Sequence, residues 1–252
     1  MPGDELHERL AELALAGRAE RVADLGAGAG DTLVGVARRS PHSRLTAVDV
    51  NDDALAALSA RVPHARIVPH DLAEPLPFPN QAFDVVVSHN TLECLLEPAA
   101  LLEETARVLQ PGGRMVLGHT DFDTIVVAAG DRDLTRRVLR TYADLPVLYR
   151  YMARADAQMG RQLPGLVRGS SLRLEAVHAH TTVLASLPEA WAARLEEVET
   201  AVRQSTKAGQ GHVTLTELDV WIEGLHESEA SGRFLYSETA YITTATSPPA
   251  ER

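Results

Sequence analysis

The feature that most constrains the fold of this chain is a glycine-rich turn near its N-terminus. Gly26, Gly28 and Gly30 alternate with alanines directly after a short apolar run that contains Asp24. Because glycine has no Cβ atom, these positions can adopt positive φ angles and bring backbone amides close to a bound molecule. The pattern therefore predicts a strand followed by a ligand-binding turn.

A helix is expected directly after the glycines. Asp31 and Thr32 are good N-capping residues, and the positive end of a helix favours a negative group on a ligand. The spacing differs from the dinucleotide-binding fingerprint, which needs a third glycine where this chain has Asp31. The alternative interpretation is a turn rich in glycine and alanine that binds no ligand.

A second acid follows the next predicted strand. Residues 45–48 form an apolar run that ends in Asp49, about 20 residues past the glycines, where a carboxylate can accept hydrogen bonds from both hydroxyls of a ribose. Capping of the helix predicted over Asp52–Arg61 is the alternative role, but Asn51 or Asp52 can serve there. We expect Asp49 to bind ribose.

The third predicted strand, residues 65–68, leads to Asp71 and to a stretch punctuated by prolines, Glu74–Asp84. Prolines exclude a regular helix or a central strand in this stretch. The valine-rich run Asp84–Ser88 that follows is typical of a strand buried on both faces of a parallel sheet. Asp71 could also be a turn residue bonded to its own backbone.

Taken in order, these segments resemble the class I S-adenosylmethionine (SAM)-dependent methyltransferases, in their small-molecule branch. The resemblance runs from about Arg21 to about His119 and includes LPFPNQAFD and ALLEETARVLQPGGRMVL, the latter predicting a helix over Pro98–Leu109 and a fifth strand over Arg114–Leu117. The family has an α/β fold: a Rossmann-like, seven-stranded, mostly parallel sheet with helices on both faces. Its last strand is antiparallel, between strands five and six.

The resemblance implies SAM as the cofactor. It also implies that Asp71 accepts a hydrogen bond from the adenine amino group and that the amide of Leu72 donates one to a ring nitrogen of the adenine. The residues expected to bind SAM are Asp24, Gly26, Ala27, Gly28, Asp49, Val50, Asp71, Leu72, Ser88 and His89. The chain departs from the family at Cys94, where a histidine is frequent.

Candidate catalytic and acceptor-binding residues follow the fourth and fifth strands, because ligands bind beyond the carboxyl ends of strands in open α/β sheets. The catalytic candidates are His89 and Asp121, and the substrate-binding candidates are Asn90, Glu93, His119, Asp121, Asp123, Tyr149 and Arg161. Alternatively, His89 lines the cofactor through its backbone, Asn90 and Asp123 cap helices, and Arg161 forms a surface salt bridge.

One domain is expected over residues 1–252, with a cap helix within residues 1–20. The almost fifty residues Thr124–Ser171 exceed an ordinary connection and are interpreted as a helical lid over the substrate pocket. Within them we expect helices over 131–143 and 147–159 and a loop at 160–165. Beyond the lid, the pattern predicts strands over 172–186 and 233–246 and helices over 189–207 and 218–226.

The amino-acid composition restricts the classes of partner that we expect the protein to bind. A net charge of −11 argues against a nucleic-acid substrate, which requires clustered Lys and Arg. One cysteine and ten scattered histidines offer no metal site, so no metal is expected. No apolar run approaches the roughly 18 residues that span a bilayer, and we expect a cytoplasmic protein that acts as a monomer or homodimer without a membrane partner.

The predicted function is transfer of a methyl group from SAM to nitrogen, oxygen or carbon of a small molecule, with secondary metabolites as one acceptor class. The alternative is a SAM-binding protein of the same fold that transfers no methyl group, either a regulatory binder or an enzyme that uses the cofactor in another way. A nicotinamide dehydrogenase is disfavoured because Lys207, the sole lysine, is not part of a Tyr-x-x-x-Lys pair.

Overall fold

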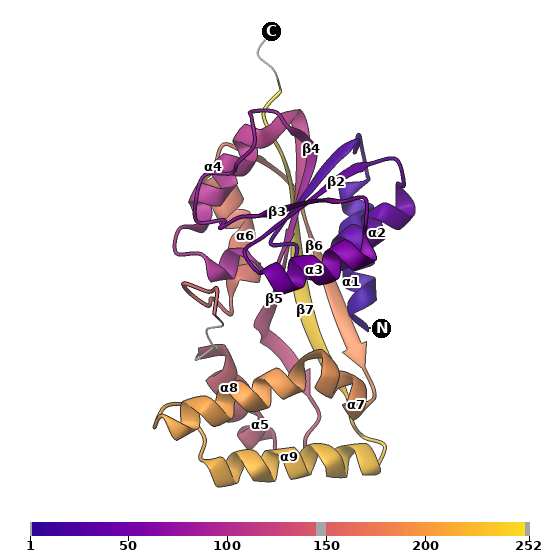
Figure 1. Ribbon diagram of the computed structural model, residues 1–252. Coiled ribbons are helices and arrows are strands. Elements are labelled where there is room, and N and C mark those ends of the chain that lie inside the picture. The colour runs from indigo at the N-terminus through magenta and orange to yellow at the C-terminus, as the bar shows by residue number, and fades with distance from the viewer. Residues whose placement is uncertain (1, 145–149, 250–252) are drawn as a thin grey trace.

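A computed structural model describes residues 2–144 and 150–249 of the chain. Within them, seven strands form one sheet in the order β3-β2-β1-β4-β5-β7-β6 (Figure 1). The strands are β1 Arg21–Leu25, β2 Arg44–Asp49, β3 Arg66–Pro69, β4 Phe83–His89, β5 Leu109–Val127, β6 Arg173–Leu184 and β7 Tyr236–Thr246. The helices are α1 Pro2–Ala14, α2 Asp31–Arg39, α3 Asp52–Arg61, η1 Leu92–Cys94, α4 Pro98–Val108, α5 Arg132–Asp144, α6 Met159–Arg168, α7 Leu187–Ala190, η2 Trp191–Leu195, α8 Glu196–Lys207 and α9 Leu215–Ala230.

The topology confirms the predicted fold class. β1 pairs in parallel with β2 and β4, and β4 pairs in parallel with β5, whereas β7 runs antiparallel between β5 and β6. The chain order reverses between β1 and β4, since β2 and β3 lie on one side of β1 and β4 and β5 on the other. Open α/β sheets bind ligands at such a reversal, beyond the carboxyl ends of the strands.

Helices cover both faces of the sheet (Figure 1). On one face, Leu10 of α1, Val36 of α2 and Leu58 of α3 are buried in one apolar cluster. On the other face, Leu101 of α4 and Leu163 of α6 belong to a second cluster. The continuous apolar runs of the central strands fit this arrangement, because each of these strands is covered on both sides.

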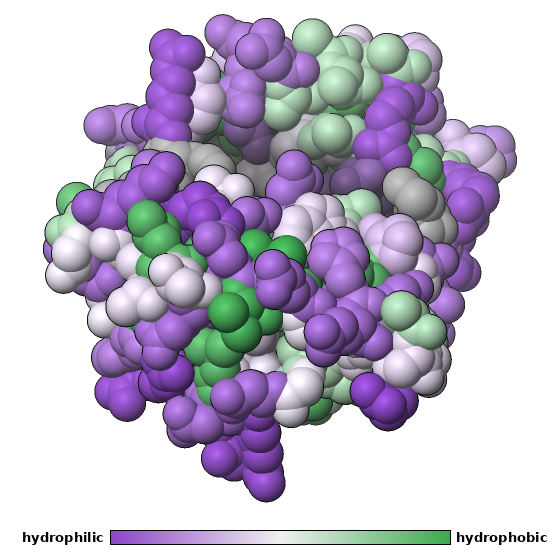
Figure 2. Space-filling model, turned by 90° about the horizontal axis from the view of Figure 1, so that it is seen from below, coloured by the Kyte–Doolittle hydropathy of each residue, from purple (hydrophilic) through white to green (hydrophobic). Residues whose placement is uncertain are grey.

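A separate group of helices lies past the ends of the three longest strands (Figure 1). It consists of α5, α7, η2, α8 and α9, called the helical layer below, and its own core includes Tyr142, Trp221 and Tyr236. Only α5 comes from the segment between β5 and β6; the other members belong to the connection between β6 and β7. The surface seen from below in Figure 2 is mostly hydrophilic, with hydrophobic residues in smaller groups.

Several expected boundaries are wrong. β5 continues to Val127 instead of ending at Leu117, so Asp123 lies within a strand and caps no helix. Asp131 serves α5 instead, since its Oδ1 accepts hydrogen bonds from the amides of Asp133 and Leu134. At α2 the N-cap is Gly30, and no side chain caps the helix.

The expected helix over 147–159 and loop over 160–165 are also wrong. Residues 150–158 are not helical, and α6 begins at Met159 and includes Pro164. A Cβ atom on Gly160 would lie 2.7 Å from the carbonyl oxygen of His119. Gly160 therefore permits α6 to pack directly on β5, a contact that no local pattern reveals.

Gly160→Ala is expected to destabilise the protein by about 1–3 kcal/mol, because the new methyl group overlaps the backbone of β5. Gly165→Ala on the same helix is the matched control. A Cβ there would meet nothing within 4 Å, so this change should stabilise the helix by about 0.5–1 kcal/mol. Urea unfolding of both variants tests the packing, and equal effects of the two would contradict it.

Candidate functional site

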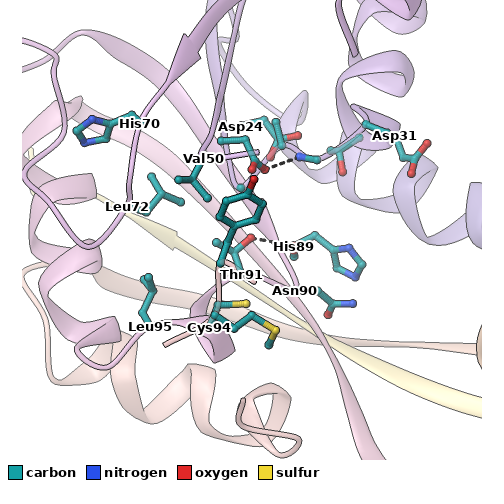
Figure 3. A pocket seen from close by; sticks show the side chains of 18 of the residues that line it. Asp24, Asp31, Val50, His70, Leu72, His89, Asn90, Thr91, Cys94 and Leu95 are labelled. Atoms are coloured by element: carbon teal, nitrogen blue, oxygen red, sulfur yellow. Dashed lines mark hydrogen bonds between the residues drawn. The ribbon is translucent and has the colours of Figure 1, made fainter. Parts of the chain in front are cut away.

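A cavity of about 370 Å³ lies where the chain order reverses, at the carboxyl ends of β1 to β4 (Figure 3). We call it the loop cavity. Nine of the ten predicted cofactor residues line it: Asp24, Gly26, Ala27, Gly28, Asp49, Val50, Asp71, Leu72 and His89. Its walls come from segments far apart in the sequence, brought together by the parallel order of the strands.

The glycine loop needs its glycines for steric reasons. Gly26, Gly28 and Gly30 have φ angles of 76°, 50° and 86°, a region in which other residues are strained. A Cβ atom at Gly26 would also lie 2.1 Å from Oγ1 of Thr91, beyond the end of β4. Since no side chain caps α2, the amides at its start stay available to an anionic group of a ligand.

Asp49 is held at the edge of the loop cavity by two backbone amides. Its Oδ2 accepts a hydrogen bond of 2.8 Å from the amide of Gly28, and its Oδ1 one of 2.9 Å from the amide of Asn51. Asn51 caps α3, which leaves Asp49 without that role. Because each carboxylate oxygen has two lone pairs, Asp49 can still accept bonds from a ligand while its orientation stays fixed.

Asp24 is the buried acid of the loop cavity. Burial raises the pKa of its carboxyl to about 8, helped by the nearby charges of Asp49 and Asp31. The group is therefore mostly protonated at neutral pH. A cationic group next to it would favour the ionised form.

Asp71 makes the turn contact of the alternative interpretation and also lies at the loop cavity, while its role toward adenine stays a prediction. Its Oδ1 accepts a hydrogen bond of 2.9 Å from the amide of Ala73, as in a local turn, while the residue also lines the loop cavity. Ser88 does not meet the prediction. Its Oγ donates to the carbonyl of Leu25 at 2.7 Å, and the residue lines neither this cavity nor the second one described below.

Two histidines meet at the end of β4. The ring of His89 contacts the ring of His7, from α1, edge to face with centroids 4.9 Å apart. Burial lowers the pKa of His89 well below its usual value, with smaller effects from His7, His119 and Arg194, so the ring is neutral. Its Nε2 is buried and has no hydrogen-bond partner among the residues that the structure describes.

Asn90 follows in a strained conformation, with a φ of 47°. Such a backbone costs on the order of 1–3 kcal/mol and persists where surrounding contacts enforce it. Here Oδ1 accepts a hydrogen bond of 3.0 Å from the amide of Thr120 on β5. The predicted alternative role as a helix cap is wrong, because the N-cap residue of η1 is Thr91.

A second cavity, of about 680 Å³, adjoins the first. We call it the layer cavity, because η2 and α7 of the helical layer form one wall. His7, Asp31, His89 and Asn90 line both cavities. The other residues around the layer cavity are Leu6, Thr120, Thr182, Pro188, Glu189, Ala192, Ala193, Arg194 and Glu238.

The candidates on β5 lie elsewhere. Successive side chains of a strand point to opposite faces, and here Thr120 reaches the layer cavity. Asp121 points the other way and is fully buried, with both oxygens 2.6 Å from nitrogens of Arg161 on α6. Asp121 therefore has no access to an acceptor in either cavity, and Arg161 forms the salt bridge of the alternative interpretation.

The remaining acceptor candidates are also directed away from the cavities. Asp123 contacts Arg161 and Gln158, and the buried Glu93 lies 3.0 Å from Nε2 of His119. Of the predicted acceptor residues in the described part of the chain, only Asn90 lines either of these two cavities. Tyr149 falls outside the described residues.

Sequence reasoning missed most of the layer cavity. His7 comes from α1, Thr182 from β6, Glu189 and Arg194 from the helical layer, and Glu238 from β7. None of these residues belongs to a motif. Arg194 lies in a π-helical segment, a feature often found at functional sites, but the sequence there reads as part of an ordinary amphipathic helix.

Two absences hold for residues 2–144 and 150–249. No group of three or more His, Cys, Asp or Glu side chains in this part could hold a metal ion. No helix in it is both long and apolar enough to cross a membrane.

The chain is similar to a known protein family and to several known proteins. Residues 23–117 match the family described as methyltransferase domain. An uncharacterised 37.1 kDa protein in transposon TN4556 of Streptomyces fradiae is 27% identical over 234 residues, which cover 91% of this chain and 63% of that protein. A trans-aconitate 2-methyltransferase of Delftia acidovorans is 30% identical over 158 residues, which cover 62% of this chain and 56% of that enzyme.

The chain thus spans less than two thirds of the length of these relatives. Among solved structures, a methyltransferase-like protein of Bacillus halodurans superposes with a TM-score of 0.62 at 19% identity, covering 96% of this chain and 98% of that one. At 19% sequence identity, this similarity shows a shared fold and nothing further.

Asp24→Asn tests the electrostatics of the loop cavity. The folded protein keeps a proton on Asp24 up to a pH of about 8, whereas the unfolded chain loses it near 3.8, the ordinary pKa of an aspartate. The free energy of unfolding therefore falls as pH rises through this window, by about 1.4 kcal/mol per pH unit. The neutral, isosteric Asn removes this dependence.

Urea unfolding of both proteins between pH 5 and pH 8, at intervals of about one unit, isolates the contribution of Asp24 as a difference. We expect the variant to gain stability relative to the native protein as pH rises. A difference that stays constant with pH would show that the Asp24 carboxyl is ionised in the folded state.

Proposed function

We propose that the chain transfers a methyl group from SAM to a small molecule, a proposal supported by the match of residues 23–117 to the methyltransferase-domain family. The observation that carries this proposal is the loop cavity. It gathers the glycine loop, Asp49 and Asp71 from the ends of β1, β2 and β3 around one space.

The groups around the loop cavity suit the parts of SAM. Asp49 only accepts hydrogen bonds, as two ribose hydroxyls require, and Asp71 with the amide of Leu72 suits the edge of an adenine. The start of α2 offers amides to a carboxylate, and Asp24 can compensate an amino group by losing its proton. The missing Cβ at Gly26 lets the backbone of the glycine loop pack against the side chain of Thr91 at the cavity wall.

The junction of the two cavities is where the reaction would occur. When bound, SAM supplies a methyl group on a positively charged sulfur. His89 and Asn90 line both cavities, so an acceptor in the layer cavity would reach the methyl group beside them. Alignment of donor and acceptor away from water provides most of the acceleration in such a transfer.

His89 is the proton acceptor in this proposal. Its ring is neutral, and its Nε2 has no partner among the described residues, so it can receive a proton from the acceptor. The positive φ of Asn90 and its bond to β5 fix the chain directly beside this ring. Asp121, which is paired with Arg161, has no part in this proposal.

Binding of S-adenosylhomocysteine (SAH), the demethylated product, tests the cofactor assignment. We expect micromolar affinity by isothermal titration and a loss of about ten- to a hundredfold in Asp49→Asn, because bonds to charged groups contribute about 1.5–3 kcal/mol. Asp52→Asn removes the same charge from the exposed first residue of α3 and should bind normally. Absence of both SAM and SAH binding would end the proposal.

His89→Asn tests the chemical step. We expect the turnover number to fall on the order of a hundredfold with little change in SAH affinity, because a lost proton acceptor slows the reaction without emptying the cavity. Since the neutral ring is the active form, the native kcat/KM should persist down to a pH well below 6.5. Retained turnover in the variant would remove His89 from the reaction; His64→Asn, at an exposed position, is the control.

A further inference from the structure

We propose that the layer cavity selects a small cationic amine with an apolar body, so that the reaction is methylation of nitrogen. This inference rests on the methyl transfer proposed above. The observation behind it is the balance of charges around the layer cavity. Three carboxylates, those of Asp31, Glu189 and Glu238, line it together with one guanidinium, that of Arg194.

Arg194 is already paired. Its Nε lies 3.1 Å from Glu238 and its Nη1 2.7 Å from Glu197, while its guanidinium carbon sits 4.8 Å from the ring centroid of Phe122. Only 13% of the side chain is exposed. Two carboxylates therefore compensate one positive charge, and the pair with Glu238 is fixed at the cavity wall.

Two buried tyrosines hold these carboxylates in place. The hydroxyl of Tyr142 donates to Glu197 at 2.9 Å, and that of Tyr236 donates to Glu238 at 2.8 Å. Both tyrosines belong to the core of the helical layer. An anionic acceptor would have to displace one of these carboxylates from Arg194, which would leave a charge without its partner.

His89 adds no positive charge that would offset the acids. Burial keeps its ring neutral. Asp31 is bridged by Arg61 at 2.6 Å on the exposed side. Glu189 is exposed and makes no ion pair among the residues that the structure describes, so no cationic side chain there is paired with its charge at the cavity wall.

Part of the remaining wall is apolar, beside the hydroxyls of Thr120 and Thr182. Leu6, Pro188, Ala192 and Ala193 line the layer cavity, and its volume of about 680 Å³ lies within the usual range for small-molecule sites. An amphipathic acceptor would place its hydrocarbon part here. Its cationic end would face the carboxylates and, at the junction, the ring of His89.

The chemistry balances without another reactant. A protonated amine gives a proton to Nε2 of His89, which frees the nitrogen lone pair. The nitrogen then bonds to the methyl carbon as the carbon–sulfur bond breaks and its electron pair returns to the sulfur. The products are the methylated ammonium and neutral SAH, and the proton on His89 passes to solvent.

Three probes with the same phenyl body test the selection: 2-phenylethylamine, 2-phenylethanol and 3-phenylpropanoate. Their binding to the SAH-loaded protein is measured by isothermal titration, and their methylation with SAM by mass spectrometry. We expect the amine to bind at least about tenfold more tightly than the alcohol, the carboxylate to bind most weakly, and the amine alone to be methylated.

Glu189→Gln sharpens the test because this residue is exposed and carries no internal ion pair among the described residues. We expect about fivefold weaker amine binding and unchanged alcohol binding, as one uncompensated charge is lost near the ligand. Glu196→Gln, an equally exposed acid of the helical layer that lines neither cavity, should leave both unchanged. Equal loss for amine and alcohol would indicate a change of shape and contradict the inference.

The two proposals fail in different ways. If SAH binds but the amine has no advantage over the alcohol and the carboxylate, including the case in which none of them binds, the amine inference is overturned and cofactor binding stands. If SAH itself does not bind, the proposed function fails first. A tricarboxylate that binds more tightly than the amine would likewise overturn the charge argument.

Discussion

The close approach of the glycine loop to the ends of β2 and β4 is the constraint on which the site depends. At Gly26 a Cβ would lie 2.1 Å from Thr91, and the amide of Gly28 donates to Asp49 at 2.8 Å. A loop with side chains could not occupy this space. The carboxylate of Asp49 would then lose the amide of Gly28, which helps to hold its orientation at the edge of the cavity.

The charges around the loop cavity and around the layer cavity both favour a positively charged group. In the loop cavity, burial keeps Asp24 protonated until a cation favours its ionised form. In the layer cavity, Arg194 is compensated by Glu238 and Glu197, Asp31 is paired with Arg61, and Glu189 has no ion-pair partner among the described residues. A neutral His89 lines both cavities, where the proposed reaction would use a proton acceptor.

Site residues close to a sequence motif could be predicted, whereas site residues that tertiary packing brings together could not. The nine cofactor residues were expected from the family resemblance together with their places at strand ends, and all nine line the loop cavity. Asp121 was misjudged because the spacing of two acids does not reveal which face of β5 they occupy. Thr120, one residue earlier, reaches the layer cavity instead. The course of α6 depended on the contact of Gly160 with β5, which is nonlocal.

The sequence by itself determined the order of the strands, the glycine loop and the acids that follow the second and third strands. These features arise from short-range causes: periodicity, backbone freedom and turn chemistry. Only the tertiary structure decided the acceptor side. His7, Thr182, Glu189, Arg194 and Glu238 meet there from five separate elements, because β6 and β7 extend to the helical layer and α1 packs beside β4. Which side chains meet across such distances is set by packing of the whole chain, and no local pattern carries that information.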